Sequence, residues 1–353
     1  MGLPSVNIIF QQKAVKAIER GSVGILAMVL KDPLATSLVE FKLSDIADMP
    51  AELTAENKEY VEHAFMGTPQ EVKVVVLPAG ASDYSAALNY LEAIRFNLAV
   101  FPGIAAADTT TIASWAKSMR DAKERKIQVV LPHSAADHEA VINFATDNIQ
   151  AFGKTYDASR YAARIAGLIA GLPLTVAPTF RVLSEVQDVP KLSKADADAA
   201  VDAGKLILYH DGGKVKIARG VTSLVTTTED KGADWKKIKL SRIYDMMYQD
   251  IKETIEDEYI GSVQNSYENK LLLLNAINAY YEVLEQERVL DTGKNRCAIN
   301  LPAQKTYLKS IGEAVDAMTE AQLKEANTRD KVFLVSNVKG LDAIEEVQLV
   351  VNL

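Results

Sequence analysis

The first half of the chain alternates short apolar runs with segments in which apolar residues recur at helical spacing. The runs predict buried strands at 72–77, 98–101 and 127–131. The helical spacing predicts helices at 54–65, 84–96 (with Asp83 as its N-cap) and 110–124. Apolar strands that alternate with helices are typical of a mostly parallel sheet with flanking helices. The pattern therefore predicts an α/β domain.

A further helix is predicted at 157–171, where four alanines at four-residue spacing would allow close approach of another helix: Ala158, Ala162, Ala166 and Ala170. Strands are expected at 180–183, 206–209 and 215–217. The last two are joined by His210-Asp-Gly-Gly213, a favourable hairpin turn. The polar, threonine-rich stretch 223–234 predicts a domain boundary.

The remaining sequence predicts an α+β domain. Long amphipathic helices are expected at 241–259 and 266–290, followed by a short helix at 305–312 and a strand at 332–335.

Both chain ends have the alternation of a half-buried strand. Val6, Ile8 and Phe10 alternate with polar residues near the start, as do Val347, Leu349 and Val351 at the end. Two interpretations remain open. The ends are ordinary strands of their own domain, or they are extended arms that donate strands to neighbouring copies of the protein.

Composition narrows the class of protein. The chain has 353 residues, of which 48% are hydrophobic and 24% charged, as in a folded protein of one or two domains. No apolar run is long enough to span a membrane, and the start lacks the features of a signal peptide. A single cysteine, Cys297, excludes an internal disulfide and suggests a reducing cytoplasm. The net charge of −8 argues against nucleic acid and membrane lipid as main partners.

Possible chemical motifs are weak. Gly153-Lys-Thr155 resembles the end of a phosphate-binding loop, but Asn148 stands where the first glycine is required. The acids Asp196, Asp198 and Asp202 are better explained as the solvated face of a helix than as a cation site. The histidines lack metal-ligand spacing: His63, His133, His138 and His210. We therefore expect no catalytic residue, no cofactor and no metal.

Several segments together resemble contractile tail sheath proteins from phages and phage-like elements of Gram-positive bacteria. They are Gly2-Leu-Pro-Ser-Val-Asn-Ile8 with Lys13-Ala-Val-Lys-Ala-Ile18, and the stretch from Ile243 to Gly261 that continues into Asn265-Ser-Tyr-Glu-Asn-Lys270. The resemblance extends over essentially the whole chain, including its last strand. Each motif alone is unspecific, so the resemblance depends on their order and joint presence.

The resemblance implies a structural subunit rather than an enzyme. Such subunits would form stacked hexameric rings, a helical polymer around a tail tube, and contract to drive the tube through a target envelope. It further implies extended N- and C-terminal β-strand arms that link neighbouring copies. The expected partners are the tail tube, baseplate and tail terminator proteins. Assembly is expected in the bacterial cytoplasm, before incorporation into a virion tail or a released bacteriocin-like particle. The resemblance divides the chain into four parts: 1–31, the N-terminal arm and start of an inner domain; 32–234, an outer α/β domain; 235–340, an inner α+β domain; and 341–353, the C-terminal arm.

Charged residues suggest two further contacts. Lys13, Lys16 and Arg20 near the start would complement acids near the end, namely Asp342, Glu345 and Glu346. Lys236, Lys237 and Lys239 either form a solvated linker or face acidic patches on the tube. Two alternatives to a phage sheath stay open: an α/β enzyme, a hydrolase or transferase whose site is scattered in sequence, and the sheath-like subunit of another secretion or injection machine.

Overall fold

The computed structural model describes residues 17–19, 21 and 23–352. The described chain divides into two compact units. The larger unit comprises the chain from Gly21 to Gln249 together with the residues from Gly340 onward, and the smaller unit contains Asp250–Lys339. Within the described residues, no helix has the length and apolar character needed to cross a membrane.

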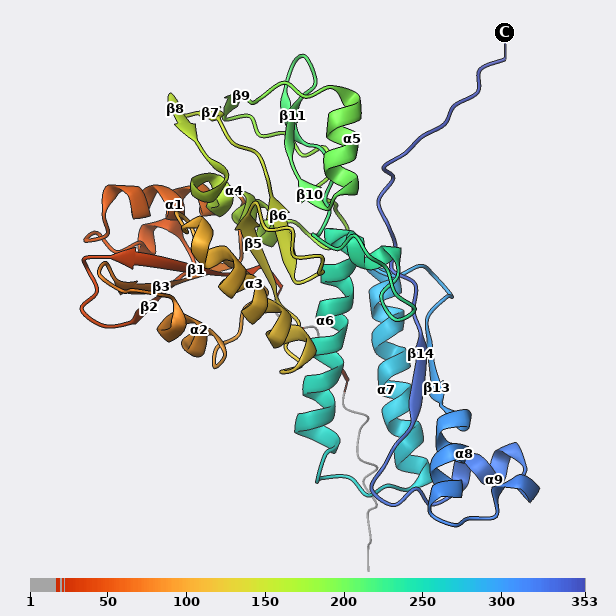
Figure 1. Cartoon of the computed structure of the whole chain (residues 1–353). Coiled ribbons are helices and arrows are strands. Elements are labelled where there is room, and N and C mark those ends of the chain that lie inside the picture. The colour runs from red at the N-terminus through yellow and green to blue at the C-terminus, as the bar shows by residue number, and fades with distance from the viewer. Residues whose placement is uncertain (1–16, 20, 22, 353) are drawn as a thin grey trace, which may run out of the picture. The chain divides into compact units, whose positions relative to one another are not determined.

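The larger unit is built on a seven-stranded sheet (Figure 1). The strand order is β10-β6-β5-β4-β1-β3-β2, and every neighbouring pair is parallel except β2 with β3. The expected parallel α/β layer is therefore confirmed. Its strands are β1 Ile25–Asp32, β2 Val39–Leu43, β3 Glu71–Pro78, β4 Leu98–Val100, β5 Gln128–Pro132, β6 Val141–Phe144 and β10 Lys205–Leu206.

Helices cover both faces of this sheet and form two cores (Figure 1). Because successive side chains of a strand point to opposite faces, Leu26, Met28 and Leu30 of β1 enter the core under α1 and α4, whereas Ala27 and Val29 enter the core under α2 and α3. The helices of this unit are α1 Ala55–Phe65, α2 Ser85–Leu91, α3 Ala106–Asp121, α4 Ala158–Gly171 and α5 Lys194–Asp202.

Helix α2 is shorter than expected and is not capped by Asp83. Its N-cap is Tyr84, and Asp83 instead accepts a hydrogen bond from the backbone N–H of Ser85 at 2.8 Å. At the other end, the Arg125 guanidinium donates to the carbonyl oxygens of Leu91 and Glu92, where the helix stops. Competing side-chain hydrogen bonds therefore set both boundaries.

Smaller sheets complete the larger unit. The expected hairpin is present as β11 Leu208–His210 and β12 Val215–Ile217. The predicted strand at 180–183 is not formed, since Val182 makes only an isolated bridge to Lys216. A three-stranded antiparallel sheet, which the sequence pattern did not predict, contains β7 Ile149–Ala151, β8 Lys154–Tyr156 and β9 Val186–Asp188. Two short 3₁₀ turns are η1 Ile46–Asp48 and η2 Ala233–Lys236.

The smaller unit is α+β, as expected. Helix α6, Ile238–Thr254, begins in the larger unit, ends in the smaller one and continues as a π-helical turn at Ile255–Tyr259. The other elements are α7 Tyr267–Gln286, β13 Arg296–Ile299, α8 Leu301–Ser310, η4 Val315–Ala317, α9 Glu320–Glu325 and β14 Leu334–Asn337. Strands β13 and β14 pair antiparallel, and the buried Cys297 lies in β13.

The unit boundaries differ from the expected domain boundaries. Residues 25–31 are expected in the N-terminal arm and inner domain, but they form most of β1, which lies between β4 and β3 in the larger unit. The boundary between the two compact units lies at 249/250 rather than at 234/235. The run Ile25–Leu30 is apolar on both faces, which is typical of a central strand and unlike the one-sided pattern of an arm.

Helices α1 and α4 pack closely, with glycines as well as alanines between them. The four predicted alanines are buried in the same core as α1, and the backbone approaches very closely at Gly167 and Gly171. A Cβ on Gly167 would lie 2.1 Å from the carbonyl oxygen of Ala64, and one on Gly171 would lie 1.8 Å from that of Gly67. Backbone atoms therefore occupy the space that any larger side chain would need.

We predict that Gly167→Ala destabilises the larger unit by about 1–3 kcal/mol, because the helices must separate to admit the methyl group. The measurement is urea-induced unfolding monitored by circular dichroism. Gly80→Ala is the matched control, since a Cβ at that position meets no atom within 4 Å. Equal unfolding midpoints for the two variants would contradict the close-packing account.

Candidate functional site

The C-terminal segment, defined here as residues 341–352, has no secondary structure in the described chain (Figure 1). Its apolar side chains from Ile344 onward are strongly exposed. The exposed fractions are 80% for Val347, 80% for Leu349 and 67% for Val351. The strand expected here does not form within the described part of its own chain, whose last strand is β14. A run of exposed apolar side chains of this kind marks an interaction surface.

One residue of the segment is an exception. The Glu345 side chain is only 8% exposed, although its neighbours Ile344 and Glu346 are 89% and 81% exposed. Its carboxylate accepts a hydrogen bond from the Thr179 hydroxyl and one from Arg219 Nε at 3.0 Å. Lys237 Nζ lies 3.6 Å from the same carboxylate. We call Thr179, Arg219 and Lys237 the Glu345 cradle.

Two lysines hold the segment just before Glu345. Lys237 also pairs with the Asp342 carboxylate, and Lys239, 4% exposed, donates to the Leu341 carbonyl oxygen at 2.7 Å. Burial lowers the pKa of Lys239, although the nearby Asp342 and Glu345 carboxylates oppose this shift. Two of the three lysines that the sequence suggested as tube-facing thus contact the C-terminal segment of their own chain. A tube contact of Lys236, Lys237 and Lys239 stays a prediction.

The acids of the segment also have partners within the chain. Asp342 pairs with Lys237, and both Glu345 and Glu346 pair with Arg219. The expected pairing of these acids with Lys13, Lys16 and Arg20 stays a prediction. These three basic residues lie outside the described residues, as do Val6, Ile8 and Phe10.

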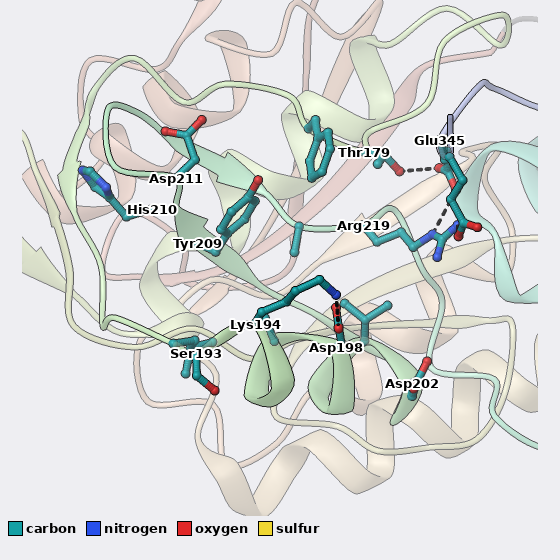
Figure 2. Close-up of a pocket in the computed structure, with 16 residues that line it drawn as sticks. Thr179, Ser193, Lys194, Asp198, Asp202, Tyr209, His210, Asp211, Arg219 and Glu345 are labelled. Atoms are coloured by element: carbon teal, nitrogen blue, oxygen red, sulfur yellow. Dashed lines mark hydrogen bonds and ion pairs between the residues drawn. The ribbon is translucent and has the colours of Figure 1, made fainter. Parts of the chain in front are cut away.

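A pocket of about 720 Å³ lies beside the cradle (Figure 2). Helix α5, the β11–β12 hairpin and the C-terminal segment supply its walls. Phe180 and Tyr209 provide an aromatic side, Lys194 pairs with Asp198 on α5, and Arg219 with Glu345 closes one end. The Phe180 side chain is 55% exposed.

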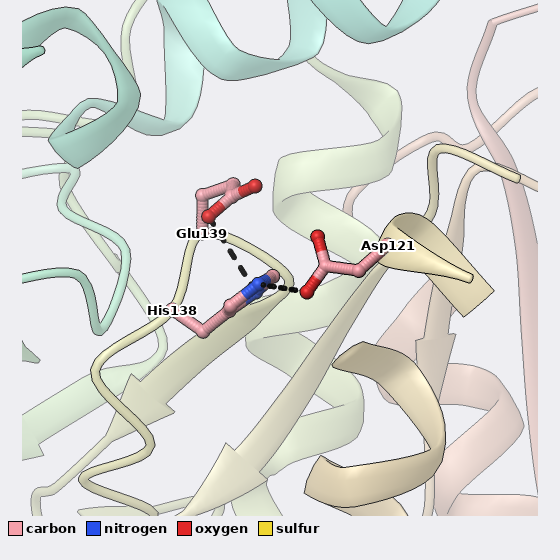
Figure 3. A group of neighbouring side chains, drawn as sticks. All are labelled: Asp121, His138 and Glu139. Carbon is pink, nitrogen blue, oxygen red and sulfur yellow. Dashed lines mark hydrogen bonds and ion pairs between the residues drawn. The ribbon is translucent and has the colours of Figure 1, made fainter. Parts of the chain in front are cut away.

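A second polar cluster lies at the end of α3 and the loop before β6 (Figure 3). Asp121, His138 and Glu139 bring one ligand atom each within 4.8 Å of one another. The His138 ring accepts from the Ala140 N–H through Nδ1, so the proton is assigned to Nε2, which lies 3.0 Å from the Asp121 carboxylate. The sequence gives no sign of this cluster around His138, because Asp121 is 17 residues away along the chain.

Lysine and arginine already neutralise this cluster. Lys231 Nζ lies 2.9 Å from Glu139 and 3.3 Å from Asp121, and Arg120 Nε lies 3.4 Å from Glu139. Burial alone would raise the pKa of Glu139, but Lys231 and Arg120 lower it below its usual value. Burial lowers the pKa of His138. The Lys231 ammonium lies within 3.3 Å of all three residues, so we describe the cluster as a salt-bridge network.

The network continues to α6 through a buried ion pair. Arg120, 1% exposed, donates to both carboxylate oxygens of Asp245 at 2.7 and 2.6 Å. Burial raises the pKa of Asp245 despite this pairing. A bidentate pair of this kind fixes the orientation of two elements. It attaches the first part of α6 to α3.

The other motifs considered from the sequence have structural explanations. Gly153-Lys-Thr155 lies at the turn from β7 to β8, where Gly153 has a φ of 71°, and not at a strand-to-helix phosphate loop. The acids at 196, 198 and 202 lie on α5, none of whose residues is buried. His133 lies 2.9 Å from Asp147 and is half exposed.

Three comparisons with known proteins identify the family. Residues 78–223 match the phage tail sheath protein central domain, and residues 230–353 match the phage tail sheath C-terminal domain. The chain is 36% identical to the tail sheath protein of Clostridium phage phiCD119 over 359 aligned residues, which cover 100% of this chain and 99% of that protein.

Solved structures show the same fold. The sheath tail protein from Desulfitobacterium hafniense is similar with a TM-score of 0.69 at 18% identity, over 84% of this chain and 94% of that one. The sheath of an extracellular contractile injection system in its contracted state (PVC) is similar with a TM-score of 0.68 at 10% identity, over 100% and 98% of the two chains. Because both sheath domains match in order and the phage relative is matched over its full length, this chain belongs to the phage tail sheath protein family, a family of structural particle components.

Proposed function

We propose that this protein polymerises as stacked hexameric rings around a tail tube and contracts to drive the tube through a target cell envelope. Neighbouring copies are joined by strand donation, in which residues 347–351 of one copy extend a sheet of another. The N-terminal residues Val6, Ile8 and Phe10 act in the same way. Assembly takes place in the bacterial cytoplasm, with baseplate and tail terminator proteins at the two ends of the polymer.

The observation that carries this proposal is the exposure of the C-terminal segment. Val347, Leu349 and Val351 remain 67–80% exposed, in a chain that belongs to the sheath family. Full burial of a valine or leucine side chain contributes about 1.5–3 kcal/mol, and a strand added to a sheet edge gains main-chain hydrogen bonds as well. Pairing with a second copy of the protein would supply both the burial of these side chains and the main-chain hydrogen bonds.

Contraction needs no nucleotide in this proposal. The extended polymer stores energy as a packing from which subunits move, largely as rigid bodies, to better-buried contacts. A donated strand suits this movement, since the links between copies persist while the bodies reorient. The contacts with the tube must then be weak enough to break, as exposed ion pairs of about 0–1 kcal/mol are.

We predict that removing residues 347–353 leaves a folded protein that does not form tubes. The truncation keeps Glu345 and its cradle, so the larger unit retains its contacts. Circular dichroism measures folding, and negative-stain electron microscopy measures tube formation. Normal tubes from the truncated chain would show that this end donates no strand.

A pair of point variants makes the same test with the chain length unchanged. Leu349→Asp places a charge on the face that carries Val347 and Val351, whereas Gln348→Asp adds the same charge on the opposite face. Because the side chains of a strand alternate between faces, we expect Leu349→Asp to abolish tubes and Gln348→Asp to preserve them. Equal tube yields would argue against a strand with one buried face.

Lys236 allows the tube contact to be tested separately. Changing Lys237 or Lys239 would also disturb the C-terminal segment, because both contact it. We predict that Lys236→Glu preserves polymers of sheath alone and reduces the yield of sheath assembled around tubes, most clearly at low salt, where charges are least screened. Co-sedimentation with tubes measures this yield. Wild-type yields at low salt would exclude a tube contact at this lysine.

A further inference from the structure

We propose that Glu345 is a positioning residue for strand donation: its cradle fixes the point and direction in which residues 347–351 leave the larger unit. This inference depends on the strand donation proposed above. It adds that the donated strand is held ready by its own chain before a neighbouring copy arrives.

The first argument is the contrast in burial along the segment. Residues on both sides of Glu345 are exposed, yet the Glu345 carboxylate is withdrawn from water. A carboxylate loses a large hydration free energy on burial and remains charged there only with partners that replace the water. Thr179, Arg219 and Lys237 supply those partners, and Figure 2 shows Thr179 and Arg219 directed at the carboxylate from two sides.

The second argument is that the cradle is itself fixed by backbone hydrogen bonds. The Thr179 hydroxyl oxygen accepts from the Gly220 N–H at 3.0 Å while its proton is donated to Glu345. The Gly220 carbonyl oxygen accepts from the Ile238 N–H at the start of α6, also at 3.0 Å. A Cβ on Gly220 would lie 2.8 Å from Pro178 Cδ, so the two loops that form the cradle are in close contact. The Glu345 cradle is therefore held in place by contacts that do not involve Glu345.

The third argument is the abrupt end of these contacts. Lys239 holds Leu341, Lys237 holds Asp342, and the cradle holds Glu345. Arg219 reaches Glu346 at 2.9 Å, and within the described residues no hydrogen bond or ion pair extends beyond it. The chain thus changes from tethered to free immediately before Val347, the first residue of the proposed donated strand.

Such an anchor promotes assembly because it reduces the conformational entropy that the C-terminal segment loses when it pairs with a neighbouring copy. A free terminal segment loses backbone conformational freedom when it pairs with a sheet, and that loss subtracts from the affinity. Tethering of residues 341–346 removes part of this loss in advance. The hydrogen bonds and charges of Glu345 and Glu346 also raise the pKa of Arg219, although burial opposes the shift, so the arginine stays charged.

Limited proteolysis of the unassembled protein tests whether the anchor exists. We expect Glu345→Gln and Arg219→Ala each to increase the rate of elastase cleavage after Ala343, measured by mass spectrometry, by about tenfold, because the protease can bind this segment only when it leaves the cradle. Glu346→Gln is the matched control. It makes the same chemical change at a side chain that is 81% exposed, and we expect a change of less than about twofold, since exposed pairs contribute little.

The critical concentration for tube assembly tests what the anchor does. We expect it to rise severalfold in Glu345→Gln and in Arg219→Ala, to be largely restored in Arg219→Lys, which keeps a cation beside the carboxylate, and to remain at the wild-type value in Glu346→Gln. The double variant Glu345→Gln/Arg219→Ala should be no worse than the more severe single variant, because the two residues share one interaction.

Two results would overturn the inference while strand donation stands. One is cleavage after Ala343 at the wild-type rate in Glu345→Gln, which would mean that the carboxylate does not hold the segment. The other is faster cleavage with an unchanged critical concentration, which would mean that the anchor has no role in assembly. If strand donation itself is wrong, the chain that lacks residues 347–353 forms normal tubes. That result would overturn both the proposed function of this segment and the inference about Glu345.

Discussion

The apolar side chains at the end of the C-terminal segment find no buried position within the described part of their own chain. Its apolar side chains extend over residues 344–351, and five of them are 67–89% exposed, in a unit whose sheet has a core on each face. Hydrophobic burial and backbone pairing are the two largest gains available to an extended chain. Within the described residues neither gain is realised for this segment, so both are available for contact with another molecule.

The larger unit holds the first part of this segment, residues 341–346, in place. Its glycine-mediated contact fixes α1 against α4, and its buried pair between Arg120 and Asp245 fixes α3 against the first part of α6. The Glu345 cradle is built on the same unit, from loops next to β12 and the start of α6. A rigid body with one anchored, extended end is what a polymer needs when its subunits must reorient without separating.

The sequence predicted those parts of the fold that depend on local pattern. The strands at 72–77, 98–101 and 127–131 and the helix at 157–171 were found because apolar runs and helical spacing are local signals. No strand is predicted at 25–32, because the resemblance to sheath proteins places residues 1–31 in the N-terminal arm and inner domain; the apolar run Ile25–Leu30 is the local signal for β1. The cradle left no local signal, because Thr179 and Arg219 lie 166 and 126 residues from Glu345. Likewise, the contact between Ala64 and Gly167 depends on tertiary packing alone.

The most direct test of the account is a reconstruction, by electron cryomicroscopy, of tubes assembled from this chain, at a resolution that traces the backbone. The account predicts that residues 347–351 of each copy pair as a strand with a sheet of a neighbouring copy, with Val347, Leu349 and Val351 buried on one face. A segment folded back on its own subunit, or one that remains exposed in the assembled tube, would contradict it.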